Sequence, residues 1–283
     1  MDSSAPRDSA VPRDTGTPPP DTSVPDTSVP PPNCGQPVPA TGLVTGGTLT
    51  VAGEARGFTV NIPSTYDGRT RFPVVFAFHG DGGNGDGARA TFNFEAAHEA
   101  EAIFIYPNGR GGAWDLDSWR VSENRDVQFI DALITHAQAR YCVNAARIFA
   151  AGSSRGAYFA NHIACHRGGT IRGVAAHSGG GPYGIPSRGA VFNAMGQLVC
   201  PGQPTPVLEV IGANDGLLND ARQSRDFWKM KNTCGNGSAA SPPSPCITLS
   251  GCSKPVKYCE IPGLGHALWA NSTDATMSFF AGL

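Results

Sequence analysis

The sequence has no long apolar run and no block of basic residues, and each absence excludes a class of protein. No apolar stretch approaches the ~20 residues that a membrane-spanning helix needs, so we expect no transmembrane segment. The formal charge is −2, and no lysine- or arginine-rich run would attract nucleic acid. The eight cysteines are not spaced, relative to one another or to histidines, as the ligands of zinc sites typically are. We therefore expect neither a nucleic-acid partner nor a bound metal.

Eight cysteines nevertheless favour an oxidising compartment, either the periplasm or the extracellular space, where disulfides persist. They allow 105 pairings. Four lie in one polar segment and are expected to pair among themselves: Cys234, Cys246, Cys252 and Cys259. The other four would connect distant parts of the fold: Cys34, Cys142, Cys165 and Cys200. No export signal is visible after Met1, so we expect an exported, mature segment whose original start was replaced.

Residues 1–33 differ in composition from the rest of the chain. They contain nine prolines, no aromatic residue and the repeat PDTSV at 20–24 and 25–29. Such a segment cannot bury a core, so we expect an extended, disordered linker that tethers residues 34–283 to a surface or to another module. A tail without function is the alternative. Residues 34–283 are long enough for one large catalytic domain.

Short apolar runs alternate with helical patterns through this domain. The run PVVFAF, from 73 to 78, is typical of a strand buried on both faces. Strands are expected at 58–63, 73–80, 102–109, 147–152, 174–179, 207–212 and 256–263, and helices at 92–101, 126–141, 156–166 and 219–230. This alternation predicts an α/β fold with a mostly parallel central sheet and helices on both faces.

A candidate nucleophile lies between the fourth of these strands and the third helix. The stretch 152–156, GSSRG, matches G-x-S-x-G, and only Ser154 has a glycine two residues away on each side. In a nucleophile elbow those positions must be glycine, because side chains there would clash with the neighbouring strand and helix. By itself the motif is weak evidence in a chain with 36 glycines, but a strand before it and a helix after it are the setting that it requires. We therefore predict that Ser154 is the nucleophile.

The partners of such a serine follow it in the order acid, then histidine. His266 lies in a loop after the last strand and is the predicted general base. Asp215 comes directly after a strand and is the predicted orienting acid, whereas Asp220 has the position of a helix N-cap. His162 and His166 are expected to be surface or packing residues.

Two further histidine-containing stretches bear on the cleft. His177 ends a strand and is expected to line it. The stretch HGDGGNG begins at His79, directly after a strand, and lacks the lysine of a phosphate-binding loop. We predict an oxyanion hole formed by the backbone N–H groups of Asp81 and Arg155.

Substrate contacts are the least constrained part of the site. Trp119 and Trp269 are predicted to form an aromatic wall, since Trp269 follows His266 by three residues. His79 is predicted to contact substrate as well. A tryptophan that fills the core beneath the loop is the alternative for Trp269.

Four stretches, FHGDGGN, AGSSRGAYFA, IGANDG and GLGHALW, together resemble the secreted α/β-hydrolase esterases grouped with feruloyl esterases, acetylxylan esterases and polyhydroxybutyrate depolymerase-like proteins. The resemblance implies an α/β-hydrolase fold and a monomeric, metal-free serine esterase without a cofactor. It implies triad roles for Ser154, Asp215 and His266.

The substrate implied by the resemblance is an ester on a plant polysaccharide or a polyester, with a feruloyl ester favoured. An acetylxylan esterase or a polyester depolymerase is the alternative, and a non-catalytic surface-binding protein on the same scaffold is a third hypothesis. The chain departs from the family at Arg155, where relatives often carry a small or amide residue. It also departs in the insertion at 234–252, which is expected to reshape the rim of the cleft.

Overall fold

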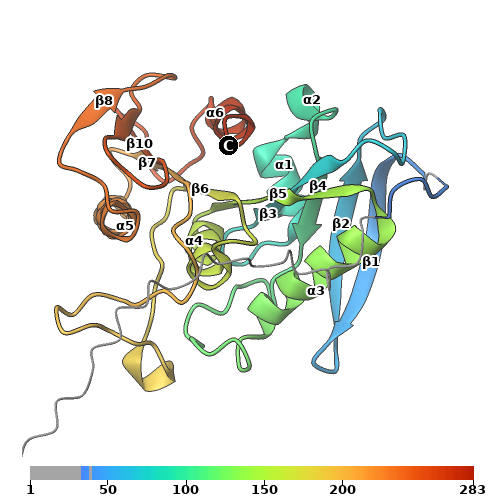
Figure 1. Ribbon diagram of the computed structural model, residues 1–283, viewed down its shortest axis with the longest axis horizontal. Coiled ribbons are helices and arrows are strands. Elements are labelled where there is room, and N and C mark those ends of the chain that lie inside the picture. Colours follow the sequence, from blue (N-terminus) through green and yellow to red (C-terminus); the bar gives the residue numbers. More distant parts are fainter. Residues whose placement is uncertain (1–32, 38–39) are drawn as a thin grey trace, which may run out of the picture. The chain divides into compact units, whose positions relative to one another are not determined.

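The computed structural model describes residues 33–37 and 40–283, so nearly all of the predicted linker lies outside the described residues. The described chain forms a ten-stranded sheet in the order β1-β2-β4-β3-β5-β6-β7-β10-β9-β8 (Figure 1). Its six central strands are parallel to one another: β4 (Ile103–Pro107), β3 (Phe72–Phe78), β5 (Val143–Ser153), β6 (Gly173–His177), β7 (Val207–Gly212) and β10 (Val256–Ile261). All six were predicted from their apolar runs. Antiparallel strands flank them on both sides, at β2 and at β9. The predicted α/β class with a mostly parallel sheet is confirmed.

Helices pack on both faces of this sheet. Alternate residues of β3 separate the two faces, since Phe76 belongs to one hydrophobic cluster and Ala77 to the other. The cluster of Phe76 also contains buried residues of α3 (Arg125–Arg140), α4 (Arg155–Arg167) and α5 (Leu218–Lys231). The cluster of Ala77 contains residues of α1 (Gly85–Phe92) and α6 (Ser272–Ala281).

Helix α3 shows how the sequence pattern produces this packing. Five residues spaced for one helix face are all buried against the sheet: Val127, Ile130, Leu133, Ile134 and Ala137. The helix begins after Asn124, whose side chain accepts hydrogen bonds from the backbone N–H groups of Asp126 and Val127.

Several elements differ from the prediction or were absent from it. Of the helix expected at 92–101, only the short α2 (Glu95–His98) forms, because α1 ends at Phe92 and Asn93 adopts a left-handed conformation between the two helices. Strand β1 (Gly42–Val51) was not predicted and pairs antiparallel with β2 (Glu54–Ile62). Helix α6 was not predicted either. The insertion forms two three-residue strands, β8 (Ser238–Ala240) and β9 (Ile247–Leu249).

Four disulfides join the eight cysteines, and they confirm the predicted division into two groups. Two lie within the insertion and the adjoining β10: Cys234–Cys252 and Cys246–Cys259. Two connect distant positions: Cys34–Cys142 and Cys165–Cys200. Such a set is typical of proteins that fold in an oxidising compartment. Among the described residues, no helix has both the length and the apolar character needed to cross a bilayer.

Candidate active site

Ser154 occupies a sharp turn between a strand and a helix. Strand β5 ends at Ser153, α4 begins at Arg155, and Ser154 between them has φ 54° and ψ −124°. A non-glycine residue with positive φ costs conformational energy, and such strain is concentrated at functional sites. The turn therefore has the backbone geometry of a nucleophile elbow.

The glycines that flank Ser154 are needed for close packing. A Cβ atom on Gly152 would lie 2.0 Å from the carbonyl oxygen of Gly156. A Cβ atom on Gly156 would lie 2.3 Å from the carbonyl oxygen of Phe78, at the end of β3. The motif is therefore set by the approach of α4 to two neighbouring strands, as predicted from the sequence.

The three side chains predicted as a triad meet at the carboxyl edge of the sheet. Asp215 follows β7 and His266 follows β10. His266 Nε2 lies 3.0 Å from Ser154 Oγ, and His266 Nδ1 lies 2.9 Å from Asp215 Oδ2 and 3.1 Å from Oδ1. The imidazole thus bridges a hydroxyl and a carboxylate that are far apart in the sequence.

Burial differs sharply within this group. The Asp215 side chain is 1% exposed, whereas that of His266 is 48% exposed. A backbone N–H, that of Leu217, donates to Asp215 Oδ1 at 2.9 Å and helps to fix the carboxylate. The acid is therefore held in the interior, while the imidazole is half exposed to solvent.

The glycine-rich loop after β3 lies beside the serine. A Cβ atom on Gly80 would be 3.3 Å from Ser154 Cβ, so the loop and the elbow are in contact. Asp81, the next residue, has its carboxylate 3.7 Å from Arg155 Nε. Arg155 Nε also donates to the carbonyl of Trp114 at 2.9 Å, which holds its guanidinium at the edge of the cleft.

His79, predicted to contact substrate, is instead buried and absent from the wall of the cavity at Ser154. The His79 Nε2 accepts a hydrogen bond of 2.9 Å from the backbone N–H of Gly109. Nδ1 therefore carries the proton and donates to the carbonyl of Gly80 at 2.7 Å. Burial lowers the pKa of His79, which favours this neutral form. With both ring nitrogens bonded to backbone groups, the residue braces the glycine-rich loop after β3.

The prediction that Trp119 forms part of an aromatic wall at the site is also wrong. The residue is buried in a cluster with the Cys165–Cys200 disulfide, and its ring centroid lies 4.5 Å from that of His166. It does not line the cavity at Ser154. Trp269 is half-buried and packs against the cluster of α1 and α6; it is likewise absent from the cavity wall.

The sequence pointed to four other side chains, three histidines and one aspartate. His177 does not line the cleft as expected: it is fully buried, lies 2.8 Å from Thr276 Oγ1, and has its pKa lowered to about 3 by burial. His162 and His166 are buried packing residues, in agreement with one of the two roles expected. Asp220 does not cap α5, since the N-cap position is Leu217.

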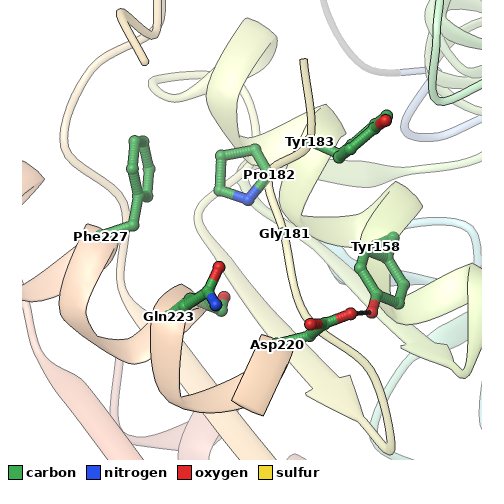
Figure 2. A pocket seen from close by; sticks show the side chains of 8 residues that line it. Tyr158, Gly181, Pro182, Tyr183, Asp220, Gln223 and Phe227 are labelled. Carbon is green, nitrogen blue, oxygen red and sulfur yellow. Dashed lines mark hydrogen bonds between the residues drawn. The ribbon is translucent and has the colours of Figure 1, made fainter. Parts of the chain in front are cut away.

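A cavity of about 350 Å³ opens at Ser154. Besides the serine, Asp81 and Arg155, it is lined by Leu116, Asp117, Tyr158, Tyr183 and Asp220. A second cavity of about 310 Å³ shares Tyr158, Tyr183 and Asp220 with it (Figure 2). Sequence reasoning did not identify these three shared residues as substrate contacts. For Tyr158 a signal exists, because it lies one helical turn after Ser154 on the same face of α4.

The parallel sheet, the strained serine elbow and the acid and histidine after later strands define an α/β-hydrolase. Comparison with known proteins agrees. The sequence model of the Esterase family, described as "Putative esterase", matches residues 50–234. Feruloyl esterase C of Emericella nidulans is 31% identical over 243 residues, covering 80% of this chain and 84% of the relative.

More distant matches support the same fold. Feruloyl esterase D of Neurospora crassa is 25% identical over 203 residues, covering 66% of this chain and 63% of the relative. The solved structure of an acetyl xylan esterase from Aspergillus awamori superposes with a TM-score of 0.63 at 17% identity, covering 85% of this chain and 99% of that one. The chain belongs to the Esterase family, within the α/β-hydrolase group that includes feruloyl and acetylxylan esterases, and is a carboxylic ester hydrolase.

Proposed function

We propose that this protein is a feruloyl esterase that uses Ser154, His266 and Asp215 as its catalytic triad. The observation that carries the proposal is the bridging imidazole, with Nε2 3.0 Å from the serine oxygen and Nδ1 2.9 Å from a buried carboxylate. This is the hydrogen-bonding pattern that activates a serine nucleophile. The feruloyl specificity is supported by relatives of that name at about 30% identity.

In the first half of the proposed reaction, Ser154 Oγ attacks the ester carbonyl while His266 Nε2 takes its proton. Asp215 accepts the hydrogen bond from Nδ1–H, which keeps the other ring nitrogen free as a base. It also stabilises the imidazolium that forms. Because Asp215 is buried and bonded to a backbone N–H, it holds this tautomer without rearranging.

The tetrahedral oxyanion would be bound by the backbone N–H groups of Asp81 and Arg155. The contact of Gly80 with Ser154 supports this role for the loop, and the start of α4 directs its first N–H groups toward the same region. His266 then protonates the leaving alkoxide. Water repeats the sequence on the acyl-enzyme, releasing the acid and restoring the serine.

The substrate context is part of the proposal. An exported monomer that acts on feruloyl groups of plant cell-wall polysaccharide agrees with the disulfides and with the names of the relatives. Residues 1–33 would serve as a spacer that tethers the domain, because their composition predicts an extended chain. Sedimentation of the full chain tests whether the protein is a monomer. Removal of residues 1–33 should weaken retention of the protein at the surface to which it is tethered, without changing turnover of a soluble ester.

Substitution of the serine tests the catalytic assignment. Ser154→Ala should reduce turnover of p-nitrophenyl acetate and methyl ferulate by a factor on the order of 10⁴ to 10⁶, because nucleophilic attack is lost. Ser153→Ala is the matched control, since the adjacent hydroxyl has no place in the triad and its loss should leave turnover within a few-fold of the wild type. Comparable turnover by the Ser154 variant and the wild type would refute the assignment.

The choice of ester is tested separately with a panel of substrates. Wild-type enzyme is given methyl ferulate, acetylated xylan and a short polyhydroxyalkanoate, and the liberated acids are identified by mass. Release of ferulate at the highest kcat/KM is the expected result. Preferential release of acetate or hydroxyalkanoate would retain the esterase but reject the feruloyl specificity.

A further inference from the structure

Asp220 stands in the wall shared by the two cavities next to Ser154. Its carboxylate accepts a hydrogen bond from the hydroxyl of Tyr158, which projects from α4 one turn beyond the nucleophile (Figure 2). Tyr183 completes the shared wall and is 46% exposed. A ligand bound at Ser154 that fills either cavity therefore has this carboxylate in the wall around it.

The Asp220 carboxylate keeps acceptor capacity after binding Tyr158. An ionised carboxylate has about four lone-pair sites, and the tyrosine hydroxyl uses one of them. Burial raises the pKa of Tyr158, and its hydrogen bond to Asp220 and the charge of that group raise it further. The tyrosine consequently remains a neutral donor and holds the carboxylate in place.

An apolar ring placed against this wall would exclude water from the Asp220 carboxylate and would offer it no hydrogen-bond donor in exchange. Removing a charged acceptor from water without a new donor is unfavourable, so the wall disfavours ligands that lack one. A phenol is a stronger donor than a sugar hydroxyl because it is more acidic, with a pKa near 10. The flat rings of Tyr158 and Tyr183, with Leu116 nearby, suit an aromatic group that ends in such a donor.

We propose that Asp220 selects acyl groups bearing a free phenolic hydroxyl by accepting a hydrogen bond from that hydroxyl. This inference rests on the proposed function, since it assumes a hydroxycinnamoyl ester bound at Ser154. In such an ester the phenol lies across a ring and two further carbons from the carbonyl under attack, which directs it away from the nucleophile. Asp220 is then a specificity-determining residue and takes no part in the chemical step.

The test compares two esters that differ at this hydroxyl. For wild-type enzyme, kcat/KM for methyl ferulate should exceed that for methyl 3,4-dimethoxycinnamate by about 10-fold to 100-fold, the range of one hydrogen bond to a charged group. Asp220→Asn should lower that ratio several-fold, and Asp220→Ala should bring it close to one. The loss should come from methyl ferulate.

Asp226→Asn is the matched control, because it makes the same chemical change on α5 at an exposed carboxylate that pairs with Arg225. It should keep the wild-type ratio. Asp117→Asn tests another exposed carboxylate of the cavity wall, and a collapse of the ratio in that variant alone would overturn the proposal. So would a loss in the Asp220 variants that is confined to feruloylated oligosaccharides, because Asp220 would then serve the sugar.

The two proposals fail in different ways. If wild-type enzyme does not hydrolyse methyl ferulate, the feruloyl specificity is wrong. If it hydrolyses both esters equally well, the esterase stands and the role of Asp220 is rejected. Should the Asp220 variants not fold, inhibition of the wild type decides: ferulate should inhibit more strongly than 3,4-dimethoxycinnamate, and equal inhibition would reject the role.

Discussion

Glu209 is a fully buried carboxyl group outside the proposed chemistry. It lies on β7, where Oε1 accepts hydrogen bonds from Ser224 Oγ at 2.6 Å and from Asn161 Nδ2 at 2.9 Å. Asn161 in turn accepts from Trp228 Nε1 at 2.9 Å. Burial raises the pKa of Glu209 to about 8, against the ordinary value of 4.5, although both hydrogen bonds oppose that shift. The side chain is therefore a neutral polar link between β7, α4 and α5.

This shift sets the sign of a pH effect on stability. The native state keeps the proton until about pH 8, whereas the unfolded chain loses it near pH 4.5, so the contribution of Glu209 is greatest below pH 4.5 and decreases toward pH 8. Glu209→Gln keeps the acceptor oxygen and removes the titration. The free energy of unfolding of the variant relative to wild type should therefore increase between pH 4.5 and 8, by on the order of 1 kcal/mol per pH unit.

Urea denaturation at several pH values between 4 and 8 measures this difference. Glu123→Gln is the control, because it makes the same substitution at a side chain that is 50% exposed, where a surface ion pair contributes little to stability. Its difference from wild type should therefore stay flat across the range. A flat difference for Glu209→Gln as well would mean that the carboxyl is ionised in the native state.

The helices and strands could be predicted where burial of one or both faces requires a regular pattern of apolar residues. Central strands such as β3 are apolar along their length because both faces are covered, and α3 has an apolar stripe because only one face is. Strand β1 was missed because most of its residues are exposed, which removes the pattern. Its two-residue turn has positive φ at both Ala52 and Gly53, as a type I′ hairpin turn requires, and in the sequence only Gly53 indicates it.

The site was predictable to the extent that backbone geometry restricts residue type. The elbow demands glycines around Ser154, and the chain order of the triad then singles out Asp215 and His266. The direction of a single side chain carries no such restriction. His79 and Trp119 were predicted to contact substrate, but both side chains are buried in the core. Asp220 was not predicted as a substrate contact, because its place in the cavity depends on how α5 meets α4, where Tyr158 donates to it.

The junction of β5 and α4 gives a prediction about the elbow itself. Gly156→Ala places a Cβ atom 2.3 Å from the carbonyl oxygen of Phe78, so α4 must move away from β3. Overpacking of this kind costs about 1–3 kcal/mol, and the displaced serine should lose about 10²-fold in kcat for p-nitrophenyl acetate.

Thermal denaturation and steady-state kinetics of the same preparation measure the two effects of Gly156→Ala. Gly282→Ala is the control, since a Cβ atom there would meet nothing nearer than 3.5 Å. It should retain both the melting temperature and kcat. Wild-type kcat in Gly156→Ala would mean that the close approach of α4 to β3 is not needed for catalysis.

Across the whole domain, the disulfides close loops of very different length. Cys34–Cys142 joins residues 108 positions apart and fastens the start of the described chain to the beginning of β5. Cys246–Cys259 joins residues only 13 positions apart, within the insertion and β10. A crosslink restricts the unfolded chain more when its loop is longer, so the two bonds should differ in their effect on stability.

Removal of each bond tests this ordering. By loop length alone, the pair Cys34→Ala and Cys142→Ala should lower the free energy of unfolding by about 5 kcal/mol, and the pair Cys246→Ala and Cys259→Ala by about 3 kcal/mol. Guanidinium denaturation of both double variants measures the difference, with the reduced and alkylated wild type as the reference for loss of all four bonds. The expected order of the two losses follows from the unfolded state, because removing the disulfide that closes the longer loop gives the unfolded chain more additional conformations. A larger loss in the second pair would show instead that native contacts around β10, where Cys259 is fully buried, outweigh loop entropy.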